Sequence, residues 1–308
     1  MKTFTSLEQF SPTKKTVITI GTFDGVHLGH KKIIEKVVQS AKLENLESLV
    51  LTFFPHPRMV LHKNSDIKLL NTISEKQELL QNLGLNNLMI HAFDKHFSEL
   101  SPEEFVLEIL IKKLNIQKII IGYDHRFGKN RSAGIDDLIL LSKKYNFEVE
   151  QISAQELNEI AISSTIIRNA ISDGNIILAN KYLGYNYFFS GKIVQGKQLG
   201  RTINFATANI KIEEEYKQIP KTGVYVVKSK IYSKSYFGMM NIGNRPTVDG
   251  KNQTIEVHFF DFDDDIYDQN LTVEVLDFLR DEQKFESVEH LKNQLEKDKL
   301  KSLAFFDL

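Results

Sequence analysis

The stretch GTFDGVHLGH, Gly21–His30, stands between the apolar run Val17–Ile20 and the segment Lys31–Val38, whose apolar residues recur at helical spacing. This order predicts a strand, a tight glycine-containing turn and the start of a helix. Backbone N–H groups and the positive end of the helix dipole meet at such a turn, and together they bind phosphate. His27 and His30 are three residues apart and can face the same side of the first helical turn, where they add donors that can carry positive charge. We interpret the stretch as a site for a nucleoside triphosphate, and the alternative is a structural turn with two surface histidines.

Length and composition limit the class of protein. The chain has 308 residues, which suggests about two domains, and its hydrophobic content of 42% excludes intrinsic disorder. A formal net charge of −1 gives no overall basic field to attract nucleic acid or an anionic membrane. There is no cysteine, which excludes disulfides, thiolate metal sites and a cysteine nucleophile. Because no apolar run reaches the roughly 18 residues of a membrane span and the N-terminus lacks a signal-peptide core, we expect a cytoplasmic protein.

The first half of the chain alternates short apolar runs with segments of helical periodicity. The apolar runs, which we predict to be strands, lie at residues 17–20, 48–54, 87–91, 118–122 and 147–152. The helical segments lie near residues 29–44, 74–83, 101–114 and 134–146. This alternation predicts a doubly wound parallel sheet, in which ligands bind beyond the carboxyl ends of the strands. Gly21–His30 follows the first strand and GYDHRFG, Gly122–Gly128, follows the fourth, so we expect both at that edge.

The second half shows successive strands without helices between them. The alternating runs lie at residues 187–195, 205–212, 223–232, 236–242, 254–260 and 271–279. Turn residues separate them, including Gly200, Gly223, Asn244-Arg245-Pro246 and Asp249-Gly250. This pattern predicts a small antiparallel β-barrel or sandwich, followed from Ser287 by one amphipathic terminal helix. We therefore predict two domains, residues 1–185 and residues 186–308.

A cluster of hydroxyl side chains stands at a helix start in the middle of the chain. Ser163, Ser164 and Thr165 begin a helix that we expect to run to about Asp173. Hydroxyl groups in this position can bind phosphate oxygens as well as cap the helix, and Arg168 follows one turn later. The competing interpretation is a plain serine cap with a surface arginine, and these residues taken alone favour it.

The segment GKIVQGKQLGR, Gly191–Arg201, combines glycines with basic residues between two predicted strands. Such a loop can wrap phosphates through its backbone N–H groups. Thr207 and Asn209 follow it and offer oxygen ligands for Mg²⁺, which prefers few protein oxygens together with phosphates. The loop is not a Walker A sequence, because Lys197 is not followed by serine or threonine in the required frame. The alternative is a flexible hairpin.

Glu256 and His258 lie two residues apart in a predicted strand and therefore on the same face of it. A carboxylate in this position could accept the proton of an attacking hydroxyl group. The alternative, which these residues alone favour, is the ordinary polar face of a half-exposed strand. An aspartate run, Asp261 and Asp263–Asp265, follows directly, and we expect a solvated turn there rather than a metal site.

Together and in this order, the segments resemble the bacterial bifunctional riboflavin kinase and FAD synthetase family. GTFDGVHLGH is similar to its nucleotidyltransferase motif, a relative of the HIGH motif of class I aminoacyl-tRNA synthetases. IGYDHRFG and ISSTIIRNAISDGNIILANKYLGYNY resemble its second and third motifs. The segments that match the kinase half are GKIVQGKQLGRTINFATANI, GVYVV, GMMNIGNRPTVDG, IEVHFFDFDDDIY and FLRDEQKFES. The resemblance covers nearly the whole chain and implies a Rossmann-like, HIGH-type N-terminal domain and a C-terminal kinase barrel.

The resemblance implies two ATP-dependent reactions, FMN from riboflavin in the C-terminal domain and FAD with pyrophosphate from FMN in the N-terminal domain. Glu256 would be the base of the kinase step, and Thr207 and Asn209 would hold Mg²⁺. His27 and His30 would stabilise charge on the transferring phosphate and the leaving pyrophosphate. Binding of ATP or its phosphates is implied for Gly21, Phe23, Asp24, Gly29, Asp124, Ser163, Ser164, Thr165, Arg168, Gly196, Lys197, Gly200 and Arg201. Flavin binding is implied for Arg280, Glu282 and Phe285. The partners are then ATP, riboflavin and FMN, without nucleic acid or membrane, and we expect a monomer or a weak homo-oligomer.

The sequence departs from the family pattern around the first motif. Phe54 stands where aspartate is common, His125 where phenylalanine is common, and Ile166 where many members have arginine. A riboflavin kinase with a weakened or altered adenylyltransferase domain is therefore an alternative. A non-catalytic flavin- or nucleotide-binding regulator is another, and the presence of His27 and Glu256 argues against it. An unrelated nucleotidyltransferase, such as one acting on phosphopantetheine, does not account for the C-terminal pattern.

Overall fold

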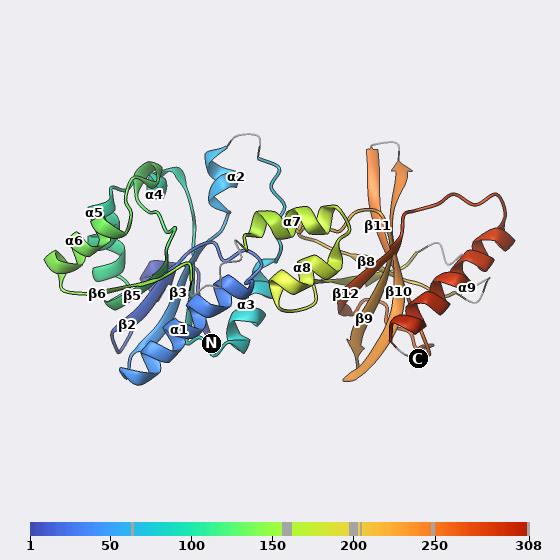
Figure 1. Ribbon diagram of the computed structural model, residues 1–308, viewed down its shortest axis with the longest axis horizontal. Coiled ribbons are helices and arrows are strands. Elements are labelled where there is room, and N and C mark those ends of the chain that lie inside the picture. Colours follow the sequence, from blue (N-terminus) through green and yellow to red (C-terminus); the bar gives the residue numbers. More distant parts are fainter. Residues whose placement is uncertain (63–64, 156–161, 197–202, 204, 248–249, 307–308) are drawn as a thin grey trace. The chain divides into compact units, whose positions relative to one another are not determined.

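The computed structural model describes residues 1–308 except 63–64, 156–161, 197–202, 204, 248–249 and 307–308. The chain divides into two units, which are described separately (Figure 1). Unit 1 comprises Met1–Ile67 and Ile73–Ile162, and unit 2 comprises Lys68–Thr72 and Ser163–Leu308.

Unit 1 contains a six-stranded sheet in which every pair of neighbouring strands is parallel. The spatial order is β1-β4-β3-β2-β5-β6. The strands are β1 (Lys2–Phe4), β2 (Thr16–Ile20), β3 (Glu47–Phe53), β4 (Asn87–His91), β5 (Ile116–Gly122) and β6 (Glu148–Ile152). All five residues of β2 are buried, as expected of a central strand covered on both faces. The five predicted strands are confirmed, whereas β1 is too short to show a period in the sequence.

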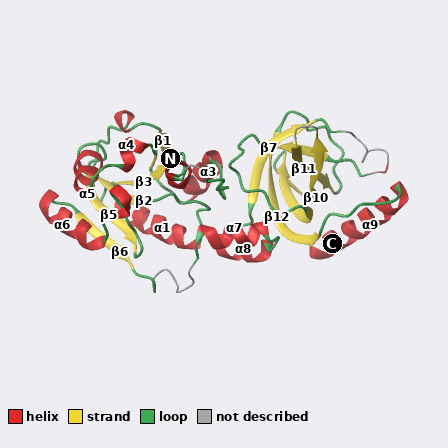
Figure 2. Ribbon diagram, turned by 90° about the horizontal axis from the view of Figure 1, so that it is seen from above, coloured by secondary structure: helices red, strands yellow, loops and turns green. Residues whose placement is uncertain are grey.

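Helices cover both faces of this sheet, which confirms the predicted doubly wound arrangement (Figure 2). They are α1 (Leu28–Leu43), α2 (Pro57–Leu61), α3 (Ile73–Asn82), α4 (Lys95–Ser98), α5 (Pro102–Glu104) continued by the π-helix η2 (Phe105–Ile111), and α6 (Ile135–Tyr145), with the 3-10 turns η1 (Leu7–Gln9) and η3 (Lys129–Arg131). Successive strand residues point to opposite faces. Leu49 and Leu51 belong to the core beneath η2 and α6. Val50, between them, belongs to the core that Ile34 of α1 and Leu80 of α3 complete.

Unit 2 is a closed antiparallel barrel, and its described residues form two helices before the barrel and one after it. The strands are β7 (Phe188–Val194), β8 (Ala208–Lys211), β9 (Gly223–Ile231), β10 (Lys234–Thr247), β11 (Gly250–Phe259) and β12 (Asn270–Arg280), in the closed order β10-β11-β8-β7-β12-β9. The helices are α7 (Ser164–Ser172), α8 (Ile176–Leu183) and α9 (Val288–Phe305). Ser287 caps α9, and Leu295 of that helix packs against the barrel core. The barrel and the terminal helix are confirmed, and α7 and α8 pack as part of this unit.

The hairpin formed by β10 and β11 is longer than predicted. The turn predicted at Asn244-Arg245-Pro246 is wrong, because the backbone of β10 stays paired through this segment. Pro246 lies opposite Lys251, and Thr247 lies opposite Gly250. Proline fits an extended backbone and removes only one donor from the ladder, so it can occupy a strand that has one unpaired position. The connection itself falls at residues 248–249, outside the described residues.

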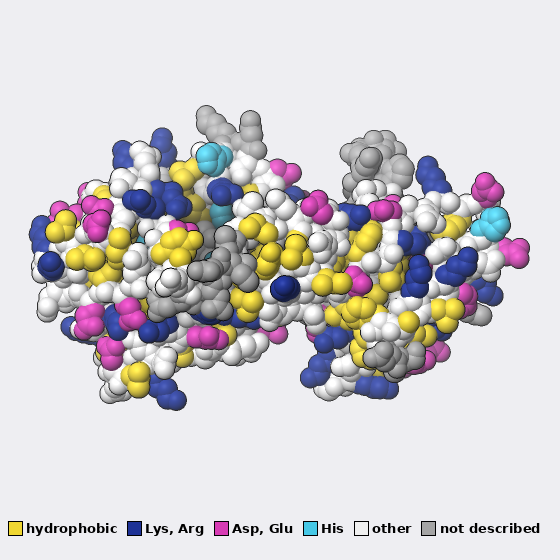
Figure 3. Space-filling view, viewed as in Figure 1, with side chains coloured by type: hydrophobic (Ala, Val, Ile, Leu, Met, Phe, Trp, Pro, Cys, Tyr) yellow, Lys and Arg dark blue, Asp and Glu magenta, His cyan; other side chains and the backbone are white. Residues whose placement is uncertain are grey.

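The surfaces of both units are mixed in charge. On the face seen in Figure 3, basic and acidic side chains are interspersed over each unit. Among the described residues, no helix combines the length and the apolar character that crossing a bilayer requires. The distribution agrees with a formal net charge near zero.

Candidate active sites

The turn between β2 and α1 is held in an unusual backbone conformation. Phe23, Gly25 and Val26 all have positive φ angles, of 45°, 85° and 37°. A non-glycine residue in this region costs on the order of 1–3 kcal/mol and persists only where the surroundings impose it. The side chains of Phe23 and Val26 are buried in the core beneath α1, which anchors the turn. Gly21 leaves room for the Phe23 ring, since a Cβ at Gly21 would lie 3.1 Å from it.

The two histidines of this turn are stacked on each other. His27 is the N-cap of α1, and its Nδ1 accepts a hydrogen bond of 3.4 Å from the backbone N–H of His30. The ring centroids of His27 and His30 are 3.6 Å apart, and the rings are inclined by 19°. The prediction that both face one side of the first helical turn is therefore confirmed. Gly29 lies beside this pair and packs without crowding, because a Cβ there would be 3.4 Å from the His27 ring.

Burial keeps both imidazoles neutral in the free protein. It lowers the pKa of His27 from 6.5 to about 4. The pKa of His30 is lowered well below 6.5, first by burial and then by the neighbouring His27 and the charge of Lys76. His30 Nδ1 is buried and has no hydrogen-bond partner among the described residues. A neutral imidazole still donates one hydrogen bond, and a bound polyanion would favour its charged form.

A cavity of about 410 Å³ lies at the carboxyl ends of the unit 1 strands. It brings together three residues predicted for ATP binding or catalysis, Gly21, Phe23 and His30, with a fourth, Asp124, from the loop after β5. Five phenylalanines line it as well, namely Phe53, Phe93, Phe97, Phe105 and Phe127. A volume of this size with an aromatic lining fits a planar heteroaromatic group beside a phosphate-binding turn. These phenylalanines come from separate segments, so no local sequence pattern indicates that they meet.

Two polar residues near this cavity depend on tertiary contacts. Asp24, predicted to bind phosphate, is only 2% exposed and does not line the cavity among the residues described. Its carboxylate acts instead on the buried Lys76 of α3, whose ammonium group donates a 2.7 Å hydrogen bond to the carbonyl oxygen of Thr22. His125 lines the cavity, and its Nε2 is buried without a partner in the described part of the chain. The position of Lys76 on a polar, weakly periodic helix gave no signal of this role.

The hydroxyl cluster that begins α7 belongs to unit 2. Ser163 caps α7, because its Oγ accepts a hydrogen bond from the backbone N–H of Ile166 at 3.3 Å. Arg168 donates a 3.1 Å hydrogen bond to Thr165 Oγ1, and Ser164 is the first residue of the helix. The helix start is confirmed. That these hydroxyl groups and Arg168 bind the phosphates of ATP stays a prediction.

The predicted kinase residues meet on one side of the barrel. Asn209 on β8 lies opposite Glu256 on β11 in the strand register. Thr207 precedes β8, and its hydroxyl donates a 3.4 Å hydrogen bond to Glu256 Oε2. All three line a cavity of about 330 Å³ that also contains Asn241, the neighbour of Glu256 on β10. The arrangement places oxygen donors suited to a hard cation beside a possible proton acceptor.

The glycine-rich loop begins directly over this oxygen cluster. Gly196 follows β7, and a Cβ at that position would lie 2.2 Å from Asn209 Nδ2. Only a residue without a side chain allows the backbone to pass so close to Asn209. The other predicted loop residues, Lys197, Gly200 and Arg201, lie outside the described residues.

The three predicted flavin-binding residues line the same barrel cavity. Arg280, Glu282 and Phe285 occupy its rim beside apolar side chains from the barrel and α9. Arg280 is held by the fully buried carboxylate of Asp298, with Nη2 to Oδ2 at 2.7 Å and Nε to both oxygens at 3.0 Å. Its guanidinium carbon lies 5.9 Å from the centre of the Phe285 ring. Asp298 was not predicted, since the partner of Arg280 is 18 residues away on α9 and only packing brings the two together.

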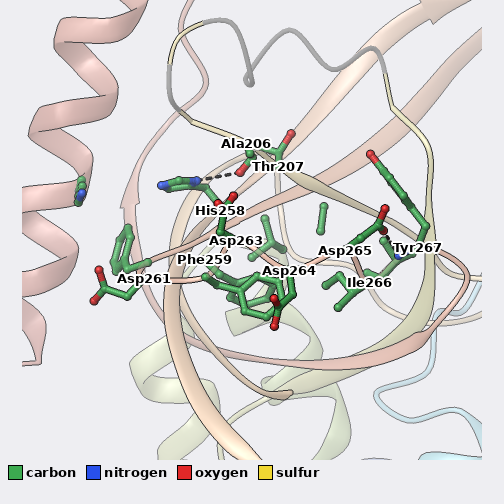
Figure 4. Close-up of a pocket in the computed structure, with 16 residues that line it drawn as sticks. Ala206, Thr207, His258, Phe259, Asp261, Asp263, Asp264, Asp265, Ile266 and Tyr267 are labelled. Atoms are coloured by element: carbon green, nitrogen blue, oxygen red, sulfur yellow. Dashed lines mark hydrogen bonds between the residues drawn. The ribbon is translucent and has the colours of Figure 1, made fainter. Parts of the chain in front are cut away.

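A hollow of about 730 Å³ is drawn in Figure 4. It adjoins the barrel cavity of about 330 Å³ at Thr207, which lines both. Asp261 and Asp263–Asp265 line the hollow, so the aspartate run forms part of a pocket wall and not only a solvated turn. His258 Nδ1 donates a 2.8 Å hydrogen bond to the carbonyl oxygen of Ala206, which fixes the ring next to Thr207. Burial lowers the pKa of His258 below its usual value.

Comparisons with known proteins agree with this division. The family model described as FAD synthetase matches residues 9–166, and the model described as riboflavin kinase matches residues 183–306. A solved structure described as a macrolide-efflux protein from Streptococcus pneumoniae is 32% identical, covers 97% of both chains and superposes with a TM-score of 0.88. That likeness shows a shared fold across both units.

Curated relatives match along nearly the full length and carry the description bifunctional riboflavin kinase/FMN adenylyltransferase. The protein of Listeria monocytogenes is 39% identical over 94% of this chain and 92% of its own. The protein of Buchnera aphidicola from Acyrthosiphon pisum is 37% identical over 95% and 94%, and that of Escherichia coli K12 is 34% identical over 97% and 95%. The chain therefore belongs to the bifunctional riboflavin kinase/FMN adenylyltransferase family, with the FAD synthetase part N-terminal and the riboflavin kinase part C-terminal, and it converts riboflavin to FMN and FMN to FAD with ATP.

Proposed function

We propose that two separate sites carry the two reactions, within residues 1–185 for adenylyl transfer and residues 186–308 for the kinase. The observation that supports this most strongly is the pair of cavities, one in each unit. The first contains Gly21, His30 and Asp124, and the second contains Thr207 and Glu256.

In the kinase step, the terminal ribityl hydroxyl of riboflavin attacks the γ-phosphorus of ATP and ADP leaves. Glu256 accepts the hydroxyl proton, because it is the carboxylate next to Thr207 in the barrel cavity. Thr207 and Asn209 would hold Mg²⁺, which supplies positive charge to the phosphates, and the closeness of Gly196 to Asn209 fits a site built for a small cation and a phosphate group.

The flavin ring would occupy the more apolar cavity, next to Phe285 and the guanidinium group that Asp298 holds in place. The adenosine part of ATP would lie beyond Thr207, in the hollow bordered by the aspartate run. Thr207 lines both spaces, so the transferring phosphoryl group passes close to its hydroxyl. Lys197, Gly200 and Arg201 would cover the phosphates.

In the adenylyl transfer, a phosphate oxygen of FMN attacks the α-phosphorus of ATP and pyrophosphate leaves. The attacking oxygen already carries negative charge, so no base is required. His30, supported by its stacked partner His27, donates hydrogen bonds to the oxygens on which charge develops. The turn after β2 contributes the backbone N–H group of Phe23, whereas the N–H of Gly21 is already bonded to the carbonyl oxygen of Leu51 at 3.1 Å.

Ser163, Ser164, Thr165 and Arg168 would bind the phosphates of ATP at the start of α7. The departures at Phe54, His125 and Ile166 still leave the histidine pair and Arg168 in place, which favours an active adenylyltransferase. We propose that the enzyme acts in the cytoplasm, as a monomer or a weak homo-oligomer and without nucleic acid or a membrane.

The two-site proposal is tested with purified protein, riboflavin, ATP and Mg²⁺, with the flavins separated by chromatography. Wild-type protein should form FMN and then FAD. Glu256→Ala should form no FMN from riboflavin, yet it should adenylylate supplied FMN at the wild-type rate. Equal loss of both steps in this variant would contradict two separate sites.

A further inference from the structure

Lys76 is buried beneath the phosphate-binding turn. It lies in α3 and is only 4% exposed, and its Nζ is 2.7 Å from the carbonyl oxygen of Thr22. Thr52 Oγ1, from β3, donates to the same oxygen at 3.1 Å. Two donors from different elements thus converge on one carbonyl group of the turn.

This convergence fixes the direction of one peptide group. The Thr22–Phe23 peptide is planar and trans, so its N–H points away from the side to which its C=O points. The carbonyl is directed to Lys76, and the N–H of Phe23 is therefore directed to the opposite side of the turn. Thr22 and Phe23 line the cavity of unit 1, whereas Lys76 is not among the described residues that do so.

The ammonium group also acts on the other charged and titratable groups of the turn. The Asp24 carboxylate stabilises its charge, while burial, the larger effect, lowers the pKa of Lys76 to about 8. The charge of Lys76 in turn helps to lower the pKa of His30, which stacks on His27. On α3 itself, the neighbouring Glu75 is buried as well. A bound triphosphate would raise the pKa values of Lys76 and His30 again, because its negative charge stabilises the cationic forms of the groups around the turn.

We propose that Lys76 is a positioning residue for adenylyl transfer, which directs the N–H of Phe23 toward the polyphosphate and places a positive charge behind the turn. The inference rests on the proposed function of the unit 1 cavity. Lys76 contacts no substrate in this role. It keeps the turn in the conformation that binds phosphate and offsets part of the charge that arrives with ATP.

The test compares Lys76→Met, which removes the charge and the donor, with Lys76→Gln, which keeps a neutral donor. Lys112→Met is the matched control, because Lys112 is an exposed lysine of the same unit. We expect Lys76→Met to lower kcat/KM for ATP in FMN adenylylation roughly 10- to 100-fold, the range for one hydrogen bond to a charged group. Riboflavin kinase activity should stay within about twofold of wild type, and Lys112→Met should change neither reaction. Lys76→Gln should recover only part of the loss, and full recovery would overturn the role of the charge.

The pH profile distinguishes positioning by charge from mere packing. In the wild type, kcat/KM for ATP should fall above about pH 8 as Lys76 loses its proton in the free enzyme. In Lys76→Met the value should be low and should not fall further over the same range. A Lys76→Met enzyme with wild-type adenylylation would overturn the proposal. If that variant does not fold, a wild-type profile that is flat from pH 7 to pH 9 would overturn it instead.

His30→Ala separates this inference from the function on which it rests. Loss of adenylylation in His30→Ala together with full activity in Lys76→Met would overturn the role of Lys76 alone. Full activity in both variants would overturn the placement of adenylyl transfer in this cavity.

Discussion

The two cavities that we propose as ATP sites differ in their side-chain chemistry. The barrel cavity presents the Glu256 carboxylate with the Thr207 hydroxyl 3.4 Å away, in reach of a reacting hydroxyl group. In the unit 1 cavity, the proposed reactive groups are instead the stacked imidazoles of His30, which lines the cavity, and of His27 behind it, whose pKa values burial lowers. The difference follows the reactions, since a hydroxyl nucleophile must lose a proton whereas the phosphate of FMN is already ionised. Preorganised donors are sufficient for the second reaction, and a proton acceptor is needed only for the first.

After the loss of the kinase step in Glu256→Ala, removing one imidazole from the unit 1 site should give the next largest effect. We expect His30→Ala to lower kcat for FMN adenylylation by roughly 10²- to 10³-fold, the usual loss when one donor to developing charge is removed. Riboflavin kinase activity in the same protein should not change. His62→Ala, at an exposed histidine of unit 1, is the control. Adenylylation within threefold of wild type in His30→Ala would assign the charge stabilisation to other groups.

The buried histidines should also make the stability of unit 1 depend on pH. Burial lowers the pKa of His125 to about 4, whereas in the unfolded chain it is near 6.5. Above pH 6.5 both states are neutral and the stability is fully present. As the pH falls from 6.5 toward 4, His125 becomes protonated in the unfolded chain but stays neutral in the folded protein. The free energy of unfolding therefore decreases.

The expected loss from His125 alone is about 2 kcal/mol of unfolding free energy between pH 7 and pH 5. His125→Phe should therefore lose about 2 kcal/mol less than wild type over that interval. Urea unfolding followed by the helical circular dichroism signal at the two pH values measures this. The same pH dependence in both proteins would show that His125 is not held neutral in the folded state.

Two glycine substitutions should give the smallest effects and differ between the sites. Gly196→Ala places a Cβ 2.2 Å from Asn209 Nδ2 and must displace that side chain, so the kinase rate should fall by about tenfold, as for one lost hydrogen bond. Gly29→Ala places a Cβ 3.4 Å from the His27 ring, an ordinary contact, and adenylylation should change by less than about twofold. Steady-state assays of both reactions on both variants provide the check. If the kinase rate of Gly196→Ala equals that of wild type, the observed position of the Asn209 side chain is not required for the kinase reaction.

Local patterns in the sequence predicted most elements because the relevant forces act within a few residues. The run Val17–Ile20 and the helical spacing after it produced β2 and α1, since a buried central strand and an amphipathic helix have distinct periods. The same reasoning failed at Asn244-Arg245-Pro246, where pairing with β11 outweighs the turn preference of the residues. The strand β1 was missed because it is stabilised by its partner β4 rather than by any pattern of its own.

The residues of the two candidate sites likewise fall into those that a local sequence pattern indicated and those that only packing brought together. By itself the sequence determined the alternation of elements, the glycine-containing turn with its two histidines, and Thr207, Asn209 and Glu256 as candidate site residues, because each is encoded in a contiguous segment. Only the tertiary structure decided which distant groups support them, namely Lys76 behind the turn and Asp298 behind Arg280. The physical reason is burial: a lysine or an aspartate acquires its role from the groups that packing places around it, and that packing joins segments far apart in the chain.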